Sequence, residues 1–176
     1  MSDNEQAVSD MYDAPVDVKA ALATAKKNAI PTGAYVSMPD EYEPNVTPFK
    51  FEGDARQYYN VFLRALQRTK GGETVQQALR FKFSSEVRPA AKYDEAGNII
   101  PGEFYEDKDD SASKRYAELV QSYLAWAGED GEPLKNVGQL ADFIKKTPLT
   151  FNTYLSRNGS LEVGGRGAVI SFKKSR

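Results

Sequence analysis

One amphipathic stretch near the middle of the chain constrains the fold more than any other feature. In residues 110–128 the apolar side chains recur at helical spacing, Asp110 or Ser111 can cap the start, and Gly128 can end the helix. The stripe that we expect to face a core consists of Tyr116, Leu119, Val120, Tyr123, Leu124 and Ala127. Any fold for this chain must therefore pack one long helix against its flanking segments.

The segments before this helix are predicted to be extended. Residues 77–89 (QALRFKFSSEVRP) alternate apolar and polar side chains, which is typical of a strand. Residues 55–70 fit helical spacing and strand alternation alike; their aromatic content favours a strand, and the helix stays open. Residues 30–38 indicate a first strand, and the three prolines in residues 39–48 indicate a loop or an edge strand.

Further elements are predicted around the long helix. Residues 94–107 indicate a turn at positions 97–98 and a short strand or extended loop. A second helix is predicted in residues 136–148, with a buried side made of Leu140, Phe143 and Ile144. Residues 149–174 are predicted to be extended, with a type I′ hairpin turn at the Asn-Gly of positions 158–159.

The order of these elements predicts a mainly β protein with helices, of the α+β class. Three strands, a helical pair and two or more strands are the order of an OB-fold, a five-stranded Greek-key barrel with its helical insertion between strands 3 and 4. A generic α+β sandwich has the same order and stays open, because periodicity does not show barrel closure. We expect residues 1–16 to be a disordered acidic tail and residues 17–176 to form a single domain, beginning with a short helix capped by Asp17 and ending before Pro31.

The composition argues against an enzyme. The 176 residues include no Cys and no His, which removes disulfides, thiol nucleophiles and the commonest general base and metal ligand. We therefore expect no catalytic activity, no cofactor and no metal. The acidic N-terminal residues are unlike a signal peptide, and no apolar run approaches the roughly 20 residues of a membrane helix. These features predict a soluble, cytoplasmic protein without membrane contact.

The near-neutral net charge of −2 hides two basic blocks. Residues 56–92 carry eight Lys or Arg side chains against two acids, and residues 145–176 carry seven against one. Residues 1–17 and 94–110 are acidic instead. Each block alone is typical of a solvated surface, but two basic blocks in strand-like segments could merge into one patch after folding.

Within the basic blocks, cations alternate with aromatic residues. Single-stranded nucleic acids are bound by this pairing, because cations track the phosphates and flat side chains stack on unpaired bases. Phe81 and Phe83 are expected to belong to the core, with Arg80 and Lys82 on the opposite, open face. The candidate binding residues are Tyr58, Arg64, Arg80, Lys82, Arg88, Tyr93, Tyr154, Arg157, Arg166 and Lys173.

Several of these segments also resemble a known family. IPTGAYVSM, YYNVFLRAL, ALRFKFSSEVRP, SASKRYAELVQSYLAWAG and the terminal hairpin resemble the OB-fold single-stranded DNA-binding proteins of tailed phages, over about residues 30–174. The resemblance implies a non-enzymatic protein that coats exposed DNA strands during phage replication or recombination in the infected host cell. It also implies replication or recombination proteins as partners, and self-association into a homo-oligomer stays open.

The chain departs from that family at its ends. Many such proteins end in an acidic tail that recruits partners, whereas this chain ends in SFKKSR and carries acids at its front. Two other functions stay open: a phage structural or accessory protein, and an inhibitor of a host enzyme, both acting by protein–protein contacts.

Overall fold

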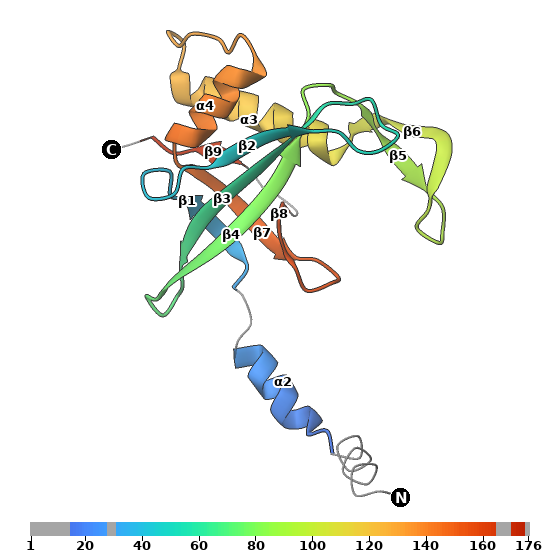
Figure 1. Ribbon diagram of the computed structural model, residues 1–176, viewed down its shortest axis with the longest axis vertical. Helices are drawn as coiled ribbons and strands as arrows, with labels where there is room; N and C mark the ends of the chain where they lie inside the picture. The colour runs from blue at the N-terminus through green and yellow to red at the C-terminus, as the bar shows by residue number, and fades with distance from the viewer. Residues whose placement is uncertain (1–14, 28–30, 165–169, 175–176) are drawn as a thin grey trace, which may run out of the picture. The chain divides into compact units, whose positions relative to one another are not determined.

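The computed structural model describes residues 15–27, 31–164 and 170–174. The chain divides into two units, residues 1–31 and residues 32–176, and each is described by itself (Figure 1). Within the described ranges, no helix is long and apolar enough to cross a lipid bilayer.

The described part of the first unit contains helix α2 (Val18–Lys27). The Asp17 carboxylate accepts a hydrogen bond from the Ala20 N–H at 2.9 Å, as an N-cap residue does. The predicted helix after Asp17 is therefore confirmed. The predicted acidic tail falls almost wholly outside the described residues, of which only positions 15 and 16 belong to it.

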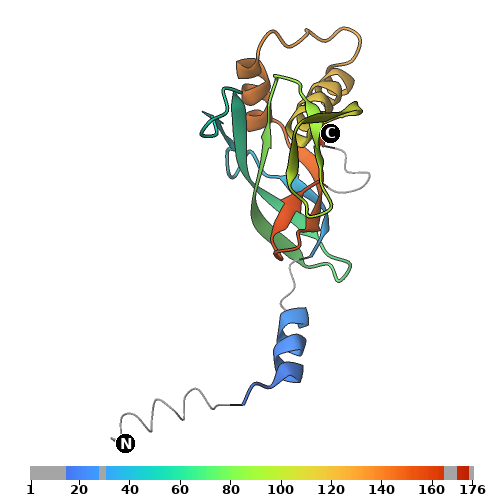
Figure 2. The same cartoon turned by 90° about the vertical axis from the view of Figure 1, so that its right-hand side faces the viewer.

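The second unit is built on an antiparallel sheet that has seven strands among the described residues. These are β1 (Gly33–Ser37), β2 (Asn45–Phe49), β3 (Tyr58–Arg68), β4 (Thr74–Phe83), β7 (Leu149–Leu155), β8 (Leu161–Val163) and β9 (Ser171–Phe172). Their order is β2-β3-β1-β7-β8, with β4 paired to β3 and β9 paired to β7. The sheet curls into a half-barrel (Figures 1 and 2). The protein is thus mainly β with helices, as predicted.

The longest pairing in this sheet is the β3–β4 hairpin. Its register is continuous from Tyr59 opposite Phe83 to Arg68 opposite Thr74. In β3 the buried and exposed side chains alternate, with Val61 buried and its neighbour Phe62 exposed. This alternation shows that residues 55–70 contribute a strand, and the alternative helix is wrong.

Helix α3 (Ser111–Ala127) begins and ends at the residues that the sequence indicates. The Asp110 carboxylate accepts a hydrogen bond from the Ser113 N–H at 2.9 Å. Gly128 has a φ of 76°, where glycine is favoured, and its N–H donates to the Leu124 carbonyl at 3.0 Å.

Helix α4 (Val137–Lys146) packs against the other end of α3. The Tyr123 and Trp126 rings of α3 both contact Phe143 of α4 edge-on, at 4.9 and 4.7 Å between centroids. Leu124, between these two residues, is 51 % exposed, so its predicted place in the core stripe is wrong. Together the helices and the sheet bury a core that includes Tyr35, Val61, Leu63, Phe81, Phe83, Leu119, Leu140, Ile144, Leu149, Phe151, Val163 and Phe172.

A separate two-stranded sheet, β5 (Pro89–Tyr93) and β6 (Ile99–Asp109), lies between β4 and α3 in the sequence. The predicted turn is confirmed, since Gly97 has a φ of 85° and the Asp94 N–H donates to the Asn98 carbonyl at 2.8 Å. The strand that follows is longer than predicted, because β6 has eleven residues. In Figure 1 this hairpin projects beside the curled sheet.

The turn between β7 and β8 differs from the predicted type. A type I′ turn needs positive φ at both central residues. Gly159 has a φ of 77°, but no other residue type in the described part of the chain has a positive φ, so Asn158 does not. The hairpin is confirmed, and its Gly159 N–H instead donates to the Ser156 carbonyl at 2.9 Å, across Arg157 and Asn158.

Candidate nucleic-acid interface

The β3–β4 hairpin has one apolar face and one basic face. Its register sets Val61 opposite Phe81 on the buried face, and Phe62 opposite Arg80 on the other face. Phe81 and Phe83 are buried, Arg80 is exposed and Lys82 is half-buried. The predicted placement of Phe81 and Phe83 in the core and of Arg80 and Lys82 on the opposite face is therefore confirmed, whereas Ser84, expected on the open face, is buried. We call the open side the basic face; it carries Tyr58, Asn60, Phe62, Arg64, Arg80 and Lys82.

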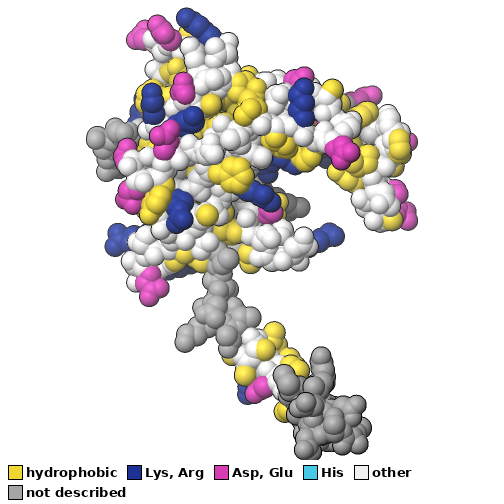
Figure 3. Space-filling model, in the orientation of Figure 1, with side chains coloured by type: hydrophobic (Ala, Val, Ile, Leu, Met, Phe, Trp, Pro, Cys, Tyr) yellow, Lys and Arg dark blue, Asp and Glu magenta, His cyan; other side chains and the backbone are white. Residues whose placement is uncertain are grey.

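Strand β2 extends the basic face at its edge. The register sets Asn45 beside Phe62, Thr47 beside Asn60, and Phe49 beside Tyr58. Figure 3 shows Lys and Arg side chains next to hydrophobic ones on the side of the sheet turned toward the viewer. Cations and apolar groups therefore share one surface, as the sequence predicts for this hairpin.

An aromatic cluster holds Lys82 at one end of this face. The ring of Phe51 lies edge-on to those of Phe49 and Tyr58, with centroids 5.0 and 4.9 Å apart. The Lys82 Nζ lies 4.7 Å from the Phe51 centroid and 6.0 Å from that of Tyr58. The cluster therefore fixes the ammonium group by cation–π attraction.

The predicted stacking residue Tyr58 is itself buried within this cluster. Its hydroxyl donates to Asp54 at 3.1 Å, and burial raises the pKa of that hydroxyl. Beside it, the rings of Phe51 and Phe62 are 45 % and 42 % exposed. Neither was selected from the sequence, although Phe62 follows directly from the alternation Tyr58, Asn60, Phe62 once β3 is taken as a strand.

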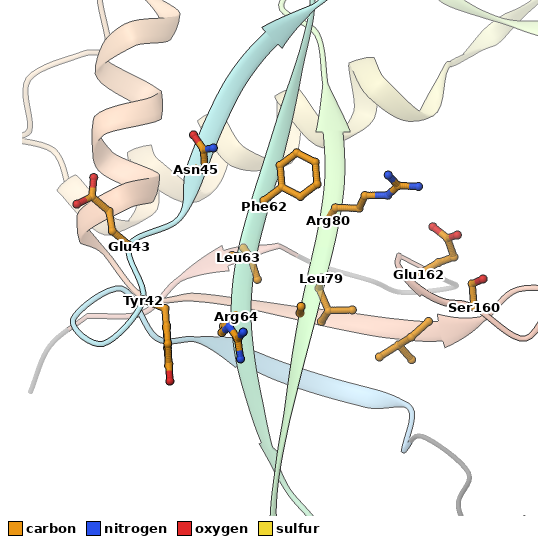
Figure 4. Close-up of a pocket in the computed structure, with 12 residues that line it drawn as sticks. Tyr42, Glu43, Asn45, Phe62, Leu63, Arg64, Leu79, Arg80, Ser160 and Glu162 are labelled. Atoms are coloured by element: carbon orange, nitrogen blue, oxygen red, sulfur yellow. The ribbon is translucent and has the colours of Figure 1, made fainter.

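At the other end of the basic face, the Arg64 guanidinium lies 4.9 Å from the centroid of the Tyr42 ring. A pocket of about 780 Å³ opens here between the β3–β4 hairpin and the β7–β8 turn. Figure 4 shows Phe62 and Arg80 beside each other on this hairpin, with Ser160 and Glu162 across the pocket. A groove with two cations, the rings of Tyr42 and Phe62, and two carboxylates, Glu43 and Glu162, thus borders the hairpin.

Two other arginines, Arg56 and Arg88, are paired with carboxylates. The guanidinium of Arg56, 1 % exposed, binds both oxygens of Asp110 and donates to the Ser113 Oγ at 2.7 Å. Burial alone would raise the pKa of Asp110, but the hydrogen bonds from Arg56 and Ser113 lower it below its ordinary value. This pair joins the loop before β3 to the start of α3, so its role is structural.

The candidate residue Arg88 is also paired, at the surface. Its Nη1 lies 3.2 Å from the Asp54 carboxylate. The Arg56 N–H, the Tyr58 hydroxyl and Arg88 donate hydrogen bonds to Asp54 and lower its pKa. In contrast, Arg64, Arg80 and Lys82 make no salt bridge with any described residue.

The structure brings only some of the predicted residues together. Tyr58, Arg64, Arg80 and Lys82 share the basic face, as stated above. Tyr154 lies opposite Glu162 in the β7–β8 ladder, and Arg157 lies in the turn between these strands. Both are exposed, but the residues of this hairpin that line the groove are Ser160, Leu161 and Glu162.

The remaining candidates are elsewhere. Tyr93 ends β5 in the separate two-stranded sheet. Lys173 follows β9, where its N–H donates to the Pro148 carbonyl at 2.8 Å, at the opposite end of β7 from Tyr154. Arg166 lies outside the described residues.

The sequence interpretation also missed Arg115, on α3. It borders a second pocket together with Arg80 and Lys82.

Comparisons of the chain with protein-family models, with curated proteins and with solved structures gave no match.

Proposed function

We propose that this protein binds single-stranded DNA without catalysis and coats exposed strands through the basic face. The observation that carries the proposal is the composition of this face. Arg64, Arg80 and Lys82 have no carboxylate partner among the described residues, and the exposed rings of Phe62 and Phe51 lie beside Arg80 and Lys82. Unpaired cations suit phosphates, and open rings suit unpaired bases, each stack adding about 1–3 kcal/mol.

The topology of the half-barrel supports an OB-type barrel within this proposal. Strand β1 pairs with both β3 and β7, and the α3–α4 pair comes between the β3–β4 and β7–β8 hairpins. Strand β4 contacts β8, although no hydrogen-bonded ladder joins them in the part of the chain that is described. OB-folds bind oligonucleotides on their second and third strands and on the loops beside them. In this chain those strands would be β3 and β4, which carry the basic face.

Single strands fit this face better than duplex DNA does. Phe62 can stack only on a base that is not already stacked and paired, whereas Arg80 beside it can contact the phosphate backbone of either form. In a phage setting, exposed strands arise during replication and recombination. Proteins of those processes, and further copies of this chain, are then the expected partners in the cytoplasm of the infected cell.

A second candidate function is favoured by the β5–β6 hairpin. Tyr93, Ile99 and Phe104 expose more than half of their surface there, beside acidic residues of β6. Exposed apolar side chains within an acidic surface suit a protein partner better than a nucleic acid. A phage structural or accessory protein, or an inhibitor of a host enzyme, would use this hairpin.

Direct binding measurements separate the two functions. We expect a fluorescent dT oligonucleotide of about 20 nucleotides to bind the protein at low salt. Its affinity should fall as salt rises and should exceed the affinity for a duplex of equal length. Equal affinity for duplex and single strand would contradict stacking at Phe62. Absence of binding to either form at low salt would contradict the proposal and leave the protein-contact function.

A further inference from the structure

A smaller pocket, of about 390 Å³, lies beside the basic face between β4 and α3. Three cations line it: Arg80 and Lys82 from β4, and Arg115 from α3. Glu162 of β8 is the single acid among its lining residues. The fold therefore gathers an excess of positive charge from elements that are far apart in the sequence.

Arg115 is the most unusual of these cations. Its side chain is half-buried, and its Nη2 donates to the Val163 carbonyl at 3.0 Å. Burial lowers the pKa of its guanidinium, while Tyr154, Glu118 and Glu162 act in the opposite direction. None of the carboxylates in the described ranges lies within 4.0 Å of it. A guanidinium has five N–H donors, so most of them are left for a ligand.

The buried Arg56 differs from Arg115 because its guanidinium has a carboxylate partner. Arg56 has a bidentate carboxylate, Asp110, and a hydroxyl, Ser113, as partners. Withdrawing a guanidinium from water without such a counter-charge is unfavourable. An anion in the pocket would supply the missing counter-charge to Arg115, and the planar guanidinium matches two oxygens of a phosphate.

We propose that this pocket holds one backbone phosphate of the bound strand against Arg115, and that Arg80 and Lys82, which also line the pocket, contact the phosphates on either side of it. The inference rests on the proposed function and adds a ligand that lies outside the basic face. The Lys82 ammonium, held over the Phe51 ring, already has a fixed position for this contact. The Glu162 carboxylate in the same pocket repels further phosphates, so the site takes one.

The test is salt-titrated binding of the dT oligonucleotide to the full chain and to Arg115→Met. Met keeps an apolar side chain in the half-buried position and removes the charge. We expect the slope of log K against log salt to fall by about 0.7, the value for one phosphate contact with a single strand. Lys146→Met, which removes an exposed charge from α4, is the matched control and should leave the slope unchanged.

A second variant and a second readout keep the test independent of folding. Arg115→Lys keeps the charge, so it should retain the wild-type slope and bind more weakly because the two-pronged contact is lost. In nitrogen-15 NMR spectra, the Arg115 Nε–H signal should shift when the oligonucleotide is added, and the Arg56 signal should not. If the wild type binds tightly but the Arg115 signal and the Arg115→Met slope are both unchanged, the phosphate site in this pocket is overturned and the proposed function is not. A wild type that binds no strand would overturn the proposed function with it.

Discussion

Phe62 of β3 lies directly opposite Arg80 of β4, on the side of the hairpin that faces away from the core. One cross-strand pair thus offers a ring for a base and a guanidinium for a phosphate at neighbouring points. On the reverse side of the same strands, the adjacent pair of Val61 and Phe81 is buried. Binding and stability are therefore assigned to alternate residues of two strands.

This alternation predicts opposite effects for two Phe→Ala substitutions. Phe62→Ala should weaken binding by about 1–3 kcal/mol, because a stacking surface is lost, and should barely change the melting temperature. Phe81→Ala should lower the free energy of unfolding by about 3–5 kcal/mol, the usual cost of truncating a buried phenylalanine. Binding titrations and thermal melts of both variants check this. If Phe62→Ala melts early and Phe81→Ala is stable, the buried face and the open face are assigned the wrong way round.

The carboxylate of Glu162 lines both pockets beside Arg80, so it opposes the approach of phosphates. Glu162→Gln should tighten binding of the dT oligonucleotide at low salt by about threefold, a change typical of one charge near the protein surface. The gain should shrink as salt rises. Glu129→Gln, an exposed acid after α3, is the control. Weaker binding of Glu162→Gln would mean that this carboxylate contacts the ligand favourably.

The buried pair of Arg56 and Asp110 predicts a pH dependence of stability. The pKa of Asp110 is lower in the folded protein than in the unfolded chain. The ionised Asp110 carboxylate therefore adds to the free energy of unfolding above the unfolded pKa of about 3.9, and this stabilisation is lost as pH falls through the folded-state pKa. Arg56→Met should destabilise the protein by about 3–5 kcal/mol, because it leaves a partly buried carboxylate without its partner.

Urea unfolding of wild type and of Asp110→Asn between pH 7 and about pH 2 measures this pair. The wild type should lose stability below about pH 4, and Asp110→Asn should lose less over the same range. Equal losses in both proteins would show that other carboxylates account for the acid sensitivity.

Much of the fold was predictable because local signals and tertiary packing agree. Asp110 and Gly128 bound α3 as capping residues, and the alternation in β4 separates Phe81 from Arg80 without reference to any neighbour. Residues 55–70 were ambiguous because helical and strand spacing both fit. The pairing with β4 decides for the strand, and no local pattern contains that pairing.

The candidate site was only partly predictable, since several of its features depend on contacts between distant segments. The sequence pattern predicts Arg88 to be an unpaired cation, yet Arg88 pairs with Asp54, thirty-four positions earlier. The sequence pattern predicts the Tyr58 ring to be exposed to a base, yet the rings of Phe49 and Phe51 pack against it. Arg115 follows no strand pattern and joins Arg80 and Lys82 only because α3 packs beside β4.

The most direct test of the basic face is a salt titration of oligonucleotide binding by the Arg80→Ala/Lys82→Ala double variant. Both side chains lie on the open face, so the variant should melt near the wild-type temperature. Loss of two phosphate contacts should weaken binding to all sequences and reduce the slope of log K against log salt by about 1.4. The exposed pair Lys135→Ala/Lys146→Ala removes equal charge elsewhere and should keep the wild-type slope. A double variant that melts like the wild type and binds with the wild-type affinity and slope would contradict the assignment of nucleic-acid binding to this face.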